Sequence, residues 1–440
     1  MNAQAYQTYE RISPPSRKEE MWRYMDFSRL PLDQVTPLKV NDQSEFPGGH
    51  IRIKSLGEGA QGHPSRVWGG HIPTKASMPE GIQAVLYEEE HDAGVLVWGN
   101  GRTWTVDLDP ALKAKGVVFM DLEEALLSMP DKVKSIWGSQ VKSDMDKFVA
   151  WHHAFCHGGV FVYIPKGVVL DKPLRSLYWW DQEGTALFPQ TVVLVDEGAE
   201  ALYIDEYVSP DMAVPGFSHS VAEVIVRPGA HLKYMNIQRW GSGVSSFLTT
   251  RARIERDAKL TSAFFALGGS VHRGDIGTNV AGEGAVSHMF GGVVGTKHQH
   301  VEHVTLQDHT APHTTSDLLF KTALKDQARS VFSGLIHVHK KAQKSNAYQA
   351  NRNLLLSGSA KADALPKLEI EADDVRCTHG ATVGTLDEEQ RFYLMSRGLS
   401  RDQAEQVMVD GFFSELLDRI KLAPVRDRLA QIISNKIYGS

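Results

Sequence analysis

The chain has 440 residues, of which 42% are hydrophobic and 23% charged, and its formal net charge is −6. This composition indicates a globular protein with an ample core, and the lack of a long basic run argues against nucleic acid as a partner. Two cysteines exclude a disulfide framework and fit a reducing compartment. The N-terminus has no apolar signal-peptide core, and no run of about 18 apolar residues occurs, so we expect a cytoplasmic protein that does not span a membrane.

Residues 1–157 predict a mixed α/β region. Within 16–30, apolar residues recur at roughly helical spacing, and 84–100 holds two apolar runs around a polar turn, which indicates a hairpin. Two short helices are expected over 120–138, the second opened by Pro130. A further helix is expected over 143–159, with Ser143 as its N-cap and an end at Gly158 and Gly159.

Residues 158–384 change to short runs of Val, Ile, Leu, Tyr and Thr between small turns. Many of these turns centre on an alanine: Ala199, Ala230, Ala258, Ala285, Ala342 and Ala360. The first four alanines are separated by 31, 28 and 27 residues, and the later spacing is irregular. A quasi-period with two short strands per repeat favours a stacked β-solenoid over a β-sandwich, and the lack of intervening helices excludes a doubly wound α/β fold.

Residues 385–440 predict a helical region. Thr385 with Glu388, and Ser400 with Gln403, have the spacing of capping boxes, and Pro424 opens a third helix. The helix after Ser400 carries one apolar stripe: Val407, Met408, Phe412, Leu416 and Ile420. Such a stripe is either domain core or a surface for a partner.

Histidines form several close groups among the 19 in the chain. Residues two apart on a strand share a face, so His298 with His300, and His337 with His339, could each present two imidazoles to a metal ion. The alternative is that they lie on a solvated strand face, as His309 and His313 also could. A fourth group, His152, His153, Cys156 and His157, shares one face of the helix expected over 143–159, where core packing is the favoured interpretation.

Cys377 and His379 lie two residues apart in the last strand-like run before the helical region. Iron–sulfur clusters take about four protein ligands, mostly thiolates, so a chain with two distant cysteines does not complete such a site alone. Part of a site shared with another subunit is chemically sensible. The sequence has no nucleophile elbow, no phosphate-binding Walker A loop and no dinucleotide-binding glycine motif.

The segment KLEIEADDVRCTHGATVGTLDEEQRFYLMSRGLS (367–400) closely resembles the C-terminal motif of the SufB/SufD family of the SUF iron–sulfur cluster assembly complex. Further family-like segments are NAYQANRNLLLS (346–357), GGVFVYIPKGV (158–168) and EEMWRYMDFSRL (19–30). The last departs from the family pattern at Met21 and Met25. Family members of the SufB branch carry Glu-Ala-Thr where this chain has His-Gly-Ala-Thr, so the resemblance favours the SufD branch.

The resemblance implies a mainly β fold, with a right-handed parallel β-helix core (158–384) between helical N- and C-terminal regions. It implies pairing with SufB through a β-helix end, and binding of the ABC-type ATPase SufC through the C-terminal helices. The stripe of Val407, Met408, Phe412, Leu416 and Ile420 then becomes a candidate SufC-binding surface. A cysteine desulfurase with a SufE- or SufU-type carrier would supply sulfur indirectly.

The same resemblance places His379 at the position associated with cluster formation at the SufB–SufD interface, with Cys377 beside it as the less certain ligand. The expected function is a non-catalytic scaffold that assembles a transient iron–sulfur cluster and supports its transfer to apoproteins. We expect no tightly bound cofactor in the isolated chain, ATP bound by SufC only, and self-association as an option without SufB. The alternatives are a β-helix carbohydrate-active enzyme and a stand-alone metal-binding protein.

Overall fold

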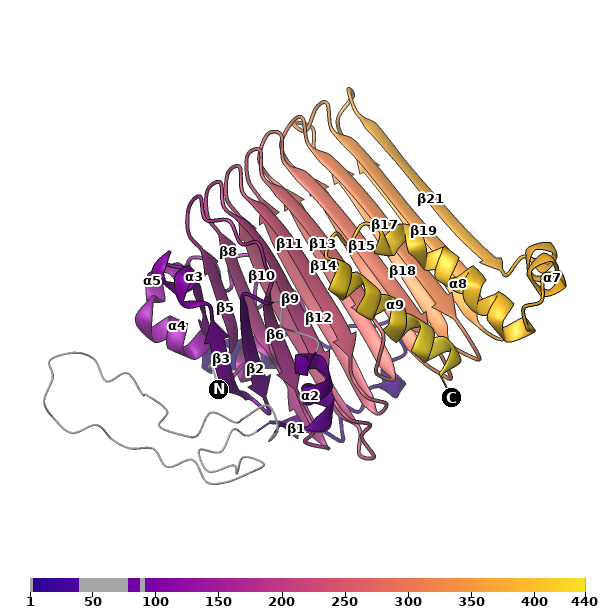
Figure 1. Ribbon diagram of the computed structural model, residues 1–440. Coiled ribbons are helices and arrows are strands. Elements are labelled where there is room, and N and C mark those ends of the chain that lie inside the picture. Colours follow the sequence, from indigo (N-terminus) through magenta and orange to yellow (C-terminus); the bar gives the residue numbers. More distant parts are fainter. Residues whose placement is uncertain (1–2, 39–77, 88–91, 440) are drawn as a thin grey trace, which may run out of the picture.

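The computed structural model describes residues 3–38, 78–87 and 92–439, and its core is a β-solenoid of parallel strands that alternate between two sheets (Figure 1). The predicted mainly β fold with helical regions at both ends is confirmed. The first sheet contains β4 (Val118–Asp121), β5 (Gly159–Ile164), β8 (Gln190–Val195), β10 (Gly216–Val226), β12 (Val244–Ile254), β14 (Val271–Val280), β16 (His300–His309), β18 (Arg329–Val338) and β20 (Lys361–Ile370), in that order. Strand β7 (Thr185–Leu187) also pairs with β10, and β1 (Thr36–Pro37) pairs with β7.

The second sheet is also parallel, apart from the antiparallel pair of β3 and β2. Its order is β3 (Arg102–Leu108), β2 (Gly94–Gly99), β6 (Leu174–Trp179), β9 (Glu200–Val208), β11 (His231–Arg239), β13 (Lys259–Ala266), β15 (Val286–Gly295), β17 (Thr315–Leu324), β19 (Asn346–Leu355) and β21 (Arg376–Thr385). Strands β2, β3 and β4 come from the predicted N-terminal region. They continue the two sheets, because β2 pairs with β6 in parallel and β4 pairs with β5 in antiparallel orientation.

One corner of the solenoid explains the alanine-centred turns. Ala199, Ala230, Ala258 and Ala285 are fully buried and directly precede β9, β11, β13 and β15. Each is preceded by a residue with positive φ, and in three of the four turns that residue is glycine, which adopts the left-handed conformation without a Cβ clash. A left-handed residue followed by a small buried one therefore turns the chain at each coil.

The later irregularity of the alanines has a structural cause. Thr314 and Ser345 take the equivalent buried position before β17 and β19, and their hydroxyl groups lie 2.7 Å apart. Ala342 lies three residues before Ser345 in a longer turn, and Ala360 lies on the opposite corner, between β19 and β20. The predicted repeat is therefore present, but the six alanines that indicated it lie on two different corners of the coil.

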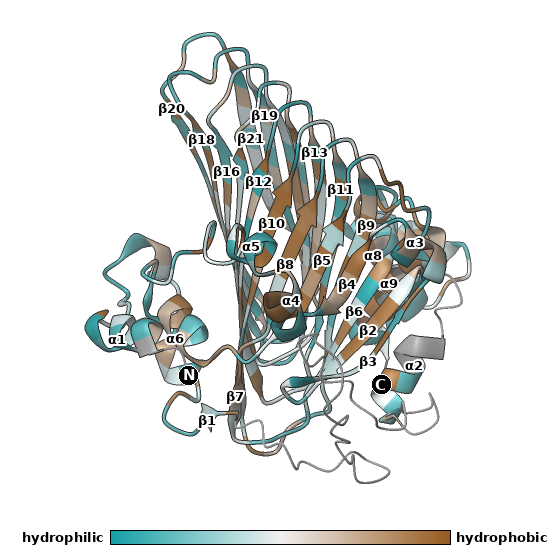
Figure 2. Ribbon diagram, turned by 90° about the vertical axis from the view of Figure 1, so that its left-hand side faces the viewer, coloured by the Kyte–Doolittle hydropathy of each residue, from teal (hydrophilic) through white to brown (hydrophobic). Residues whose placement is uncertain are grey.

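The interior between the sheets changes along the solenoid. Near its start it is apolar, with residues such as Val162, Val193 and Val224 fully or almost fully buried (Figure 2). Toward the far end, the inward-facing positions of β19 include Gln349, Asn351 and Asn353, all buried. The last coils are therefore held together by polar as well as apolar contacts.

The N-terminal region covers the outer face of the first sheet (Figure 2). Its helices are α1 (Ala3–Arg11), α3 (Pro110–Ala114), α4 (Leu122–Ser128), α5 (Pro130–Lys134) and α6 (Lys147–Phe155), with 3₁₀ turns at Glu20–Trp22 and Phe27–Arg29; α2 (Glu80–Tyr87) lies nearer the second sheet. The two helices around Pro130 are as predicted. The helical spacing within 16–30 corresponds to the two 3₁₀ turns. Trp22 in the first turn packs, together with Met25 and Leu30, against Phe217 and Phe247.

Two predictions in this region are wrong. The hairpin expected over 84–100 is instead α2 followed by β2, which pairs with β3; residues 88–91 lie outside the described residues. The N-cap of α6 is Asp146, whose carboxylate accepts from the N–H of Val149, and not Ser143. The helix ends at Phe155, three residues before Gly158.

The C-terminal region comprises α7 (Glu388–Ser396), α8 (Arg401–Leu417) and α9 (Ala423–Tyr438). Helices α8 and α9 lie across the outer face of the second sheet, whereas α7 projects beyond the end of β21 (Figure 1). The capping box of Ser400 and Gln403 is confirmed. The box predicted at Thr385 is wrong, because Thr385 ends β21 and Asp387 caps α7.

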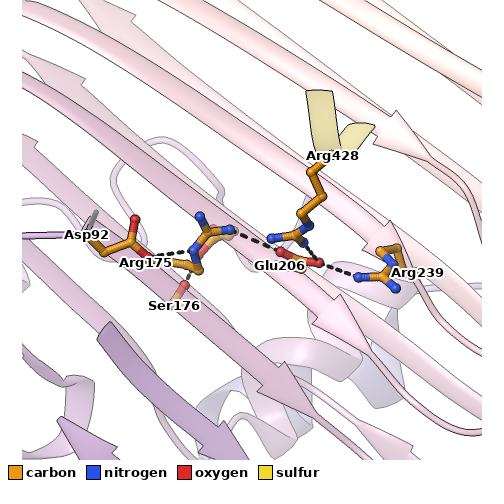
Figure 3. Close-up of polar contacts among 7 residues, drawn as sticks. Asp92, Arg175, Ser176, Glu206, Arg239 and Arg428 are labelled. Atoms are coloured by element: carbon orange, nitrogen blue, oxygen red, sulfur yellow. Dashed lines mark hydrogen bonds and ion pairs between the residues drawn. The ribbon is translucent and has the colours of Figure 1, made fainter. Parts of the chain in front are cut away.

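A buried ion-pair network holds α9 on the second sheet (Figure 3). The Glu206 carboxylate is fully buried and pairs with Arg428 of α9, with Arg239 at 2.8 Å and with Arg175 at 3.3 Å. Arg175 also pairs with Asp92 at 2.9 Å. Burial opposes the charge of Glu206, but the three guanidinium groups outweigh that effect and lower its pKa. Glu206 therefore joins the sheet to the last helix directly, and Arg175 extends the network to Asp92 in the segment before β2.

None of the helices in the described part of the chain has the length and apolar content that crossing a membrane requires.

Candidate functional site

The far end of the solenoid is open. Strands β20 and β21 are the last of their sheets among the described residues, and most of their side chains are exposed or half-buried. β20 contains Pro366, which interrupts hydrogen bonding along its edge. β21 has ten residues, no proline and no carboxylate, so its free edge is a template for pairing with another chain.

Cys377 and His379 both lie on β21, and the structure brings them together on one face. Cys377 is opposite Ala347 and His379 is opposite Gln349, and both of those β19 residues are buried inside the solenoid. The two candidate residues therefore face the inner side of the last coil. His379 is exposed, because no described strand stacks beyond β21.

The two side chains differ in environment. Cys377 is half-buried against Ile336, Val338 and Ala347, and burial raises the pKa of its thiol. A thiol must lose its proton to bind metal, so in the isolated chain Cys377 is poorly prepared to act alone. Neither residue belongs to a group of three potential metal ligands in the described part of the chain. The pair can supply part of a site that a second chain would complete.

The predicted histidine pairs have different outcomes. His298 lies in the turn before β16, which begins at His300, so the two do not share a strand face as predicted. His300 is buried beside Glu302. His309 is also buried and is hydrogen-bonded to the hydroxyls of Thr314 and Ser316, while burial lowers its pKa to about 4. His309 therefore has a structural role.

His337 and His339 do come together, with their ring centroids 4.0 Å apart, although His339 lies just after the end of β18. Asp308 of β16 lies opposite His337 in the sheet and completes a group of three potential metal ligands. The sequence analysis missed Asp308, because it lies 29 positions before His337 and only the strand register joins them. The feature of the sequence that could have identified Asp308 is the repeat, because the repeat aligns the residues of one coil with those of the next.

The group at 152–157 is structural. His152 is fully buried, with Nδ1 2.8 Å from the backbone oxygen of His219 and Nε2 3.0 Å from Oε1 of Gln190. Burial raises the pKa of the Cys156 thiol to about 12. Because α6 ends at Phe155, Cys156 is past the helix and the four side chains do not form a shared helical face.

The predicted SufC-binding stripe divides into two sets. Leu416 and Ile420 are buried against the second sheet, and Phe412 packs half-buried beside them. Met408 is half-buried and Val407 is 49% exposed. Leu416 and Ile420 therefore hold α8 in place and are not on the surface, which is a correction to their prediction as contact residues.

Other exposed apolar side chains, which the sequence analysis did not select, lie on α7. Phe392, Tyr393 and Met395 are 74%, 56% and 42% exposed. The signal for them in the sequence is the apolar run from Phe392 to Met395 in the second half of the helix. Together with Val407, they make α7 and the first half of α8 the exposed apolar part of the C-terminal region.

Comparison with known proteins matches most of the described chain. The family model for the "SUF system FeS cluster assembly, SufBD core domain" matches residues 178–412, and that for the "SufBD protein N-terminal region" matches 94–176. The iron–sulfur cluster assembly protein SufD of Bacillus subtilis (strain 168) is 29% identical over 362 residues, covering 82% of this chain and 83% of the relative.

Two further relatives are similar to the same extent. The iron–sulfur cluster assembly protein SufB of Bacillus subtilis is 29% identical over 388 residues, covering 82% and 83% of the two chains. A SufBD family protein of Staphylococcus epidermidis (strain ATCC 12228) is 29% identical over 338 residues, covering 77% and 71%. The core-domain match alone spans more than half of the sequence, so the chain belongs to the SufB/SufD family of iron–sulfur cluster assembly proteins.

Proposed function

We propose that the chain is a SufD-type scaffold subunit, which has no catalytic activity of its own and works in the cytoplasm. It would pair with a SufB-type partner through β21 and its open coil. It would bind a SufC-type ATPase through the exposed part of the C-terminal helices. The complex would assemble a transient iron–sulfur cluster, with sulfur from a cysteine desulfurase and its carrier, and would pass the cluster to apoproteins.

The observation that carries this proposal is the position of Cys377 and His379 on an unpaired edge strand. A cluster held by ligands from two chains can be bound during assembly and released when the interface moves. His379 is exposed at that edge, and Cys377 lies beside it on the same face. The choice of the SufD branch rests on the sequence His379-Gly380-Ala381-Thr382, since SufD and SufB of Bacillus subtilis are equally identical to this chain.

Co-expression with SufB- and SufC-type partners tests the pairing surface. The informative variant is Ala381→Asp, which places a charge on the exposed β21 edge, and the matched control is Val106→Asp, on β3 at the opposite end of the same sheet. We expect Ala381→Asp to lose the SufB partner in size-exclusion chromatography with light scattering, and Val106→Asp to retain it. Retention by Ala381→Asp, or loss by both variants, would place the interface elsewhere.

A further inference from the structure

A second cluster of ligand-type side chains lies outside the Cys377–His379 face, on the outer side of the first sheet. Asp308 Oδ1 is 3.2 Å from His337 Nδ1 and 2.8 Å from His339 Nε2. The three ligand atoms all lie within 4.8 Å of one another. Two ligands that share one ion at about 2.0–2.2 Å are separated by about 3–3.5 Å, so the 3.2 Å contact already has that spacing and the 2.8 Å hydrogen bond needs to lengthen only slightly to admit an ion.

The second carboxylate beside His337 makes the arrangement more specific. Glu371, just after β20, places Oε1 3.5 Å from His337 Nε2, the nitrogen that does not face Asp308. A neutral imidazole has one N–H, so it can donate to only one of these two carboxylates. If Nε2–H donates to Glu371, Nδ1 presents a lone pair toward the Asp308 oxygen, and a cation between these two atoms would satisfy both.

One divalent ion satisfies both imidazoles and Asp308 at once, because the ring centroids of His337 and His339 are 4.0 Å apart and both rings face the same Asp308 oxygen. A carboxylate that orients a ligating histidine from behind is the usual second contact of metal-bound imidazole.

We propose that Asp308, His337 and His339 form a binding site for one divalent transition-metal ion, with Glu371 as the positioning residue. Two imidazoles and one carboxylate suit ions of the Fe(II), Co(II) and Zn(II) class and leave coordination positions open. The Asp308, His337 and His339 side chains are 19%, 20% and 38% exposed, so the site is reachable from solvent. It is separate from the proposed cluster-assembly role of His379, which faces the inner side of the last coil.

The test is an anaerobic titration of the isolated chain with Co(II), followed by visible absorption, and with Zn(II), followed by calorimetry. We expect one equivalent to bind. Asp308→Asn and His339→Gln should each weaken binding by at least 10-fold, and Glu371→Gln by about 10-fold or more. The metal-dependent rise in melting temperature should disappear in Asp308→Asn, whose melting temperature without metal reports whether it folds.

Two control variants separate this site from other histidines. His231 of β11 lies 3.6 Å from Glu200 without a third ligand among the described residues, so His231→Gln should bind the ion as the wild type does. His379→Ala should also bind normally, which keeps the result independent of the proposed scaffold function. Unchanged affinity in both Asp308→Asn and His339→Gln, or loss of binding in either control, would overturn the assignment.

Discussion

At the scale of single residues, the structure separates side chains that share chemistry but not environment. The thiols and imidazoles of this chain include the buried His152, the half-buried Cys156 and the exposed His379. The core role that the sequence favours for the group at 152–157 holds for His152, which is buried. His337 and His339 lie together, which is one of the two arrangements that the sequence leaves open. Asp308 was not predicted, since side chains of successive coils meet through strand register rather than chain proximity.

Lys436 of α9 gives a residue-scale prediction of pH dependence. Its ammonium donates to the backbone oxygen of Leu267, and burial lowers its pKa from 10.5 to about 7. Between pH 7 and 10 the unfolded chain therefore keeps a proton that the folded chain has released. The free energy of unfolding should rise with pH in this window, by up to about 1.4 kcal/mol per pH unit from this group.

Urea denaturation of Lys436→Met at pH 7.5 and 9 checks this prediction. The variant lacks the titrating group, so its advantage over the wild type should be larger at pH 7.5 than at pH 9. The exposed Lys421→Met is the matched control and should differ from the wild type by the same amount at both pH values. An advantage of Lys436→Met that does not change with pH would show that Lys436 does not titrate in this range.

Glu206 gives a second residue-scale prediction. Glu206→Gln should lower the free energy of unfolding by about 3–5 kcal/mol, because it leaves three guanidinium groups around an uncharged side chain. The control is Glu197→Gln, which removes an exposed ion pair with Lys166 and should change stability by less than about 1 kcal/mol. Equal effects of the two variants in urea denaturation would mean that the network does not stabilise the fold.

At the scale of elements, the sequence predicted the repeated coil and most helices, but not every boundary. The buried alanines of the corners, and the glycines before them, recur because each coil needs one left-handed residue and one small inward side chain. The run at 84–87 was assigned to a strand and is helical, since a short apolar run alone does not distinguish the two. Similarly, Ser143 and Asp146 are both residue types that cap helices well, and in the structure the side chain of Asp146 caps α6.

Helix α8 gives a prediction that separates packing from partner binding. Leu416→Ala should lower the free energy of unfolding by about 2–5 kcal/mol, since Leu416 is buried against the second sheet. Val407→Asp should leave stability within about 1 kcal/mol, because Val407 is half exposed, but should weaken SufC binding. Calorimetric unfolding and a SufC pull-down measure the two effects. Normal SufC binding by Val407→Asp would move the contact away from this surface.

At the scale of the whole molecule, each sheet has one covered outer face and the solenoid has one open end. The N-terminal region packs on the first sheet, α8 and α9 pack on the second, and β20 and β21 remain uncapped among the described residues (Figures 1 and 2). The sequence indicates this end as a partner surface through Cys377 and His379 and through the family resemblance of the segment that contains them. The residues of a partner cannot be predicted from this chain, because they belong to another sequence.

Amide hydrogen exchange follows the open end directly. In the isolated chain, β21 should exchange faster than β12 or β13, because its outer edge is unpaired. Addition of a SufB-type partner should slow exchange in β21, with little change in β3 at the opposite end. Protection that appears first in β3 would reverse the proposed orientation of the pair.

We infer that His379 takes part in assembling a cluster shared with a second subunit. The most direct measurement is anaerobic reconstitution of the complex with SufB- and SufC-type partners, comparing the wild type with His379→Ala, and with His231→Ala as the control. We expect His379→Ala to form the complex but to lose most of the bound iron and acid-labile sulfide, while His231→Ala retains both. Full cluster content in the assembled His379→Ala complex would contradict the role of His379.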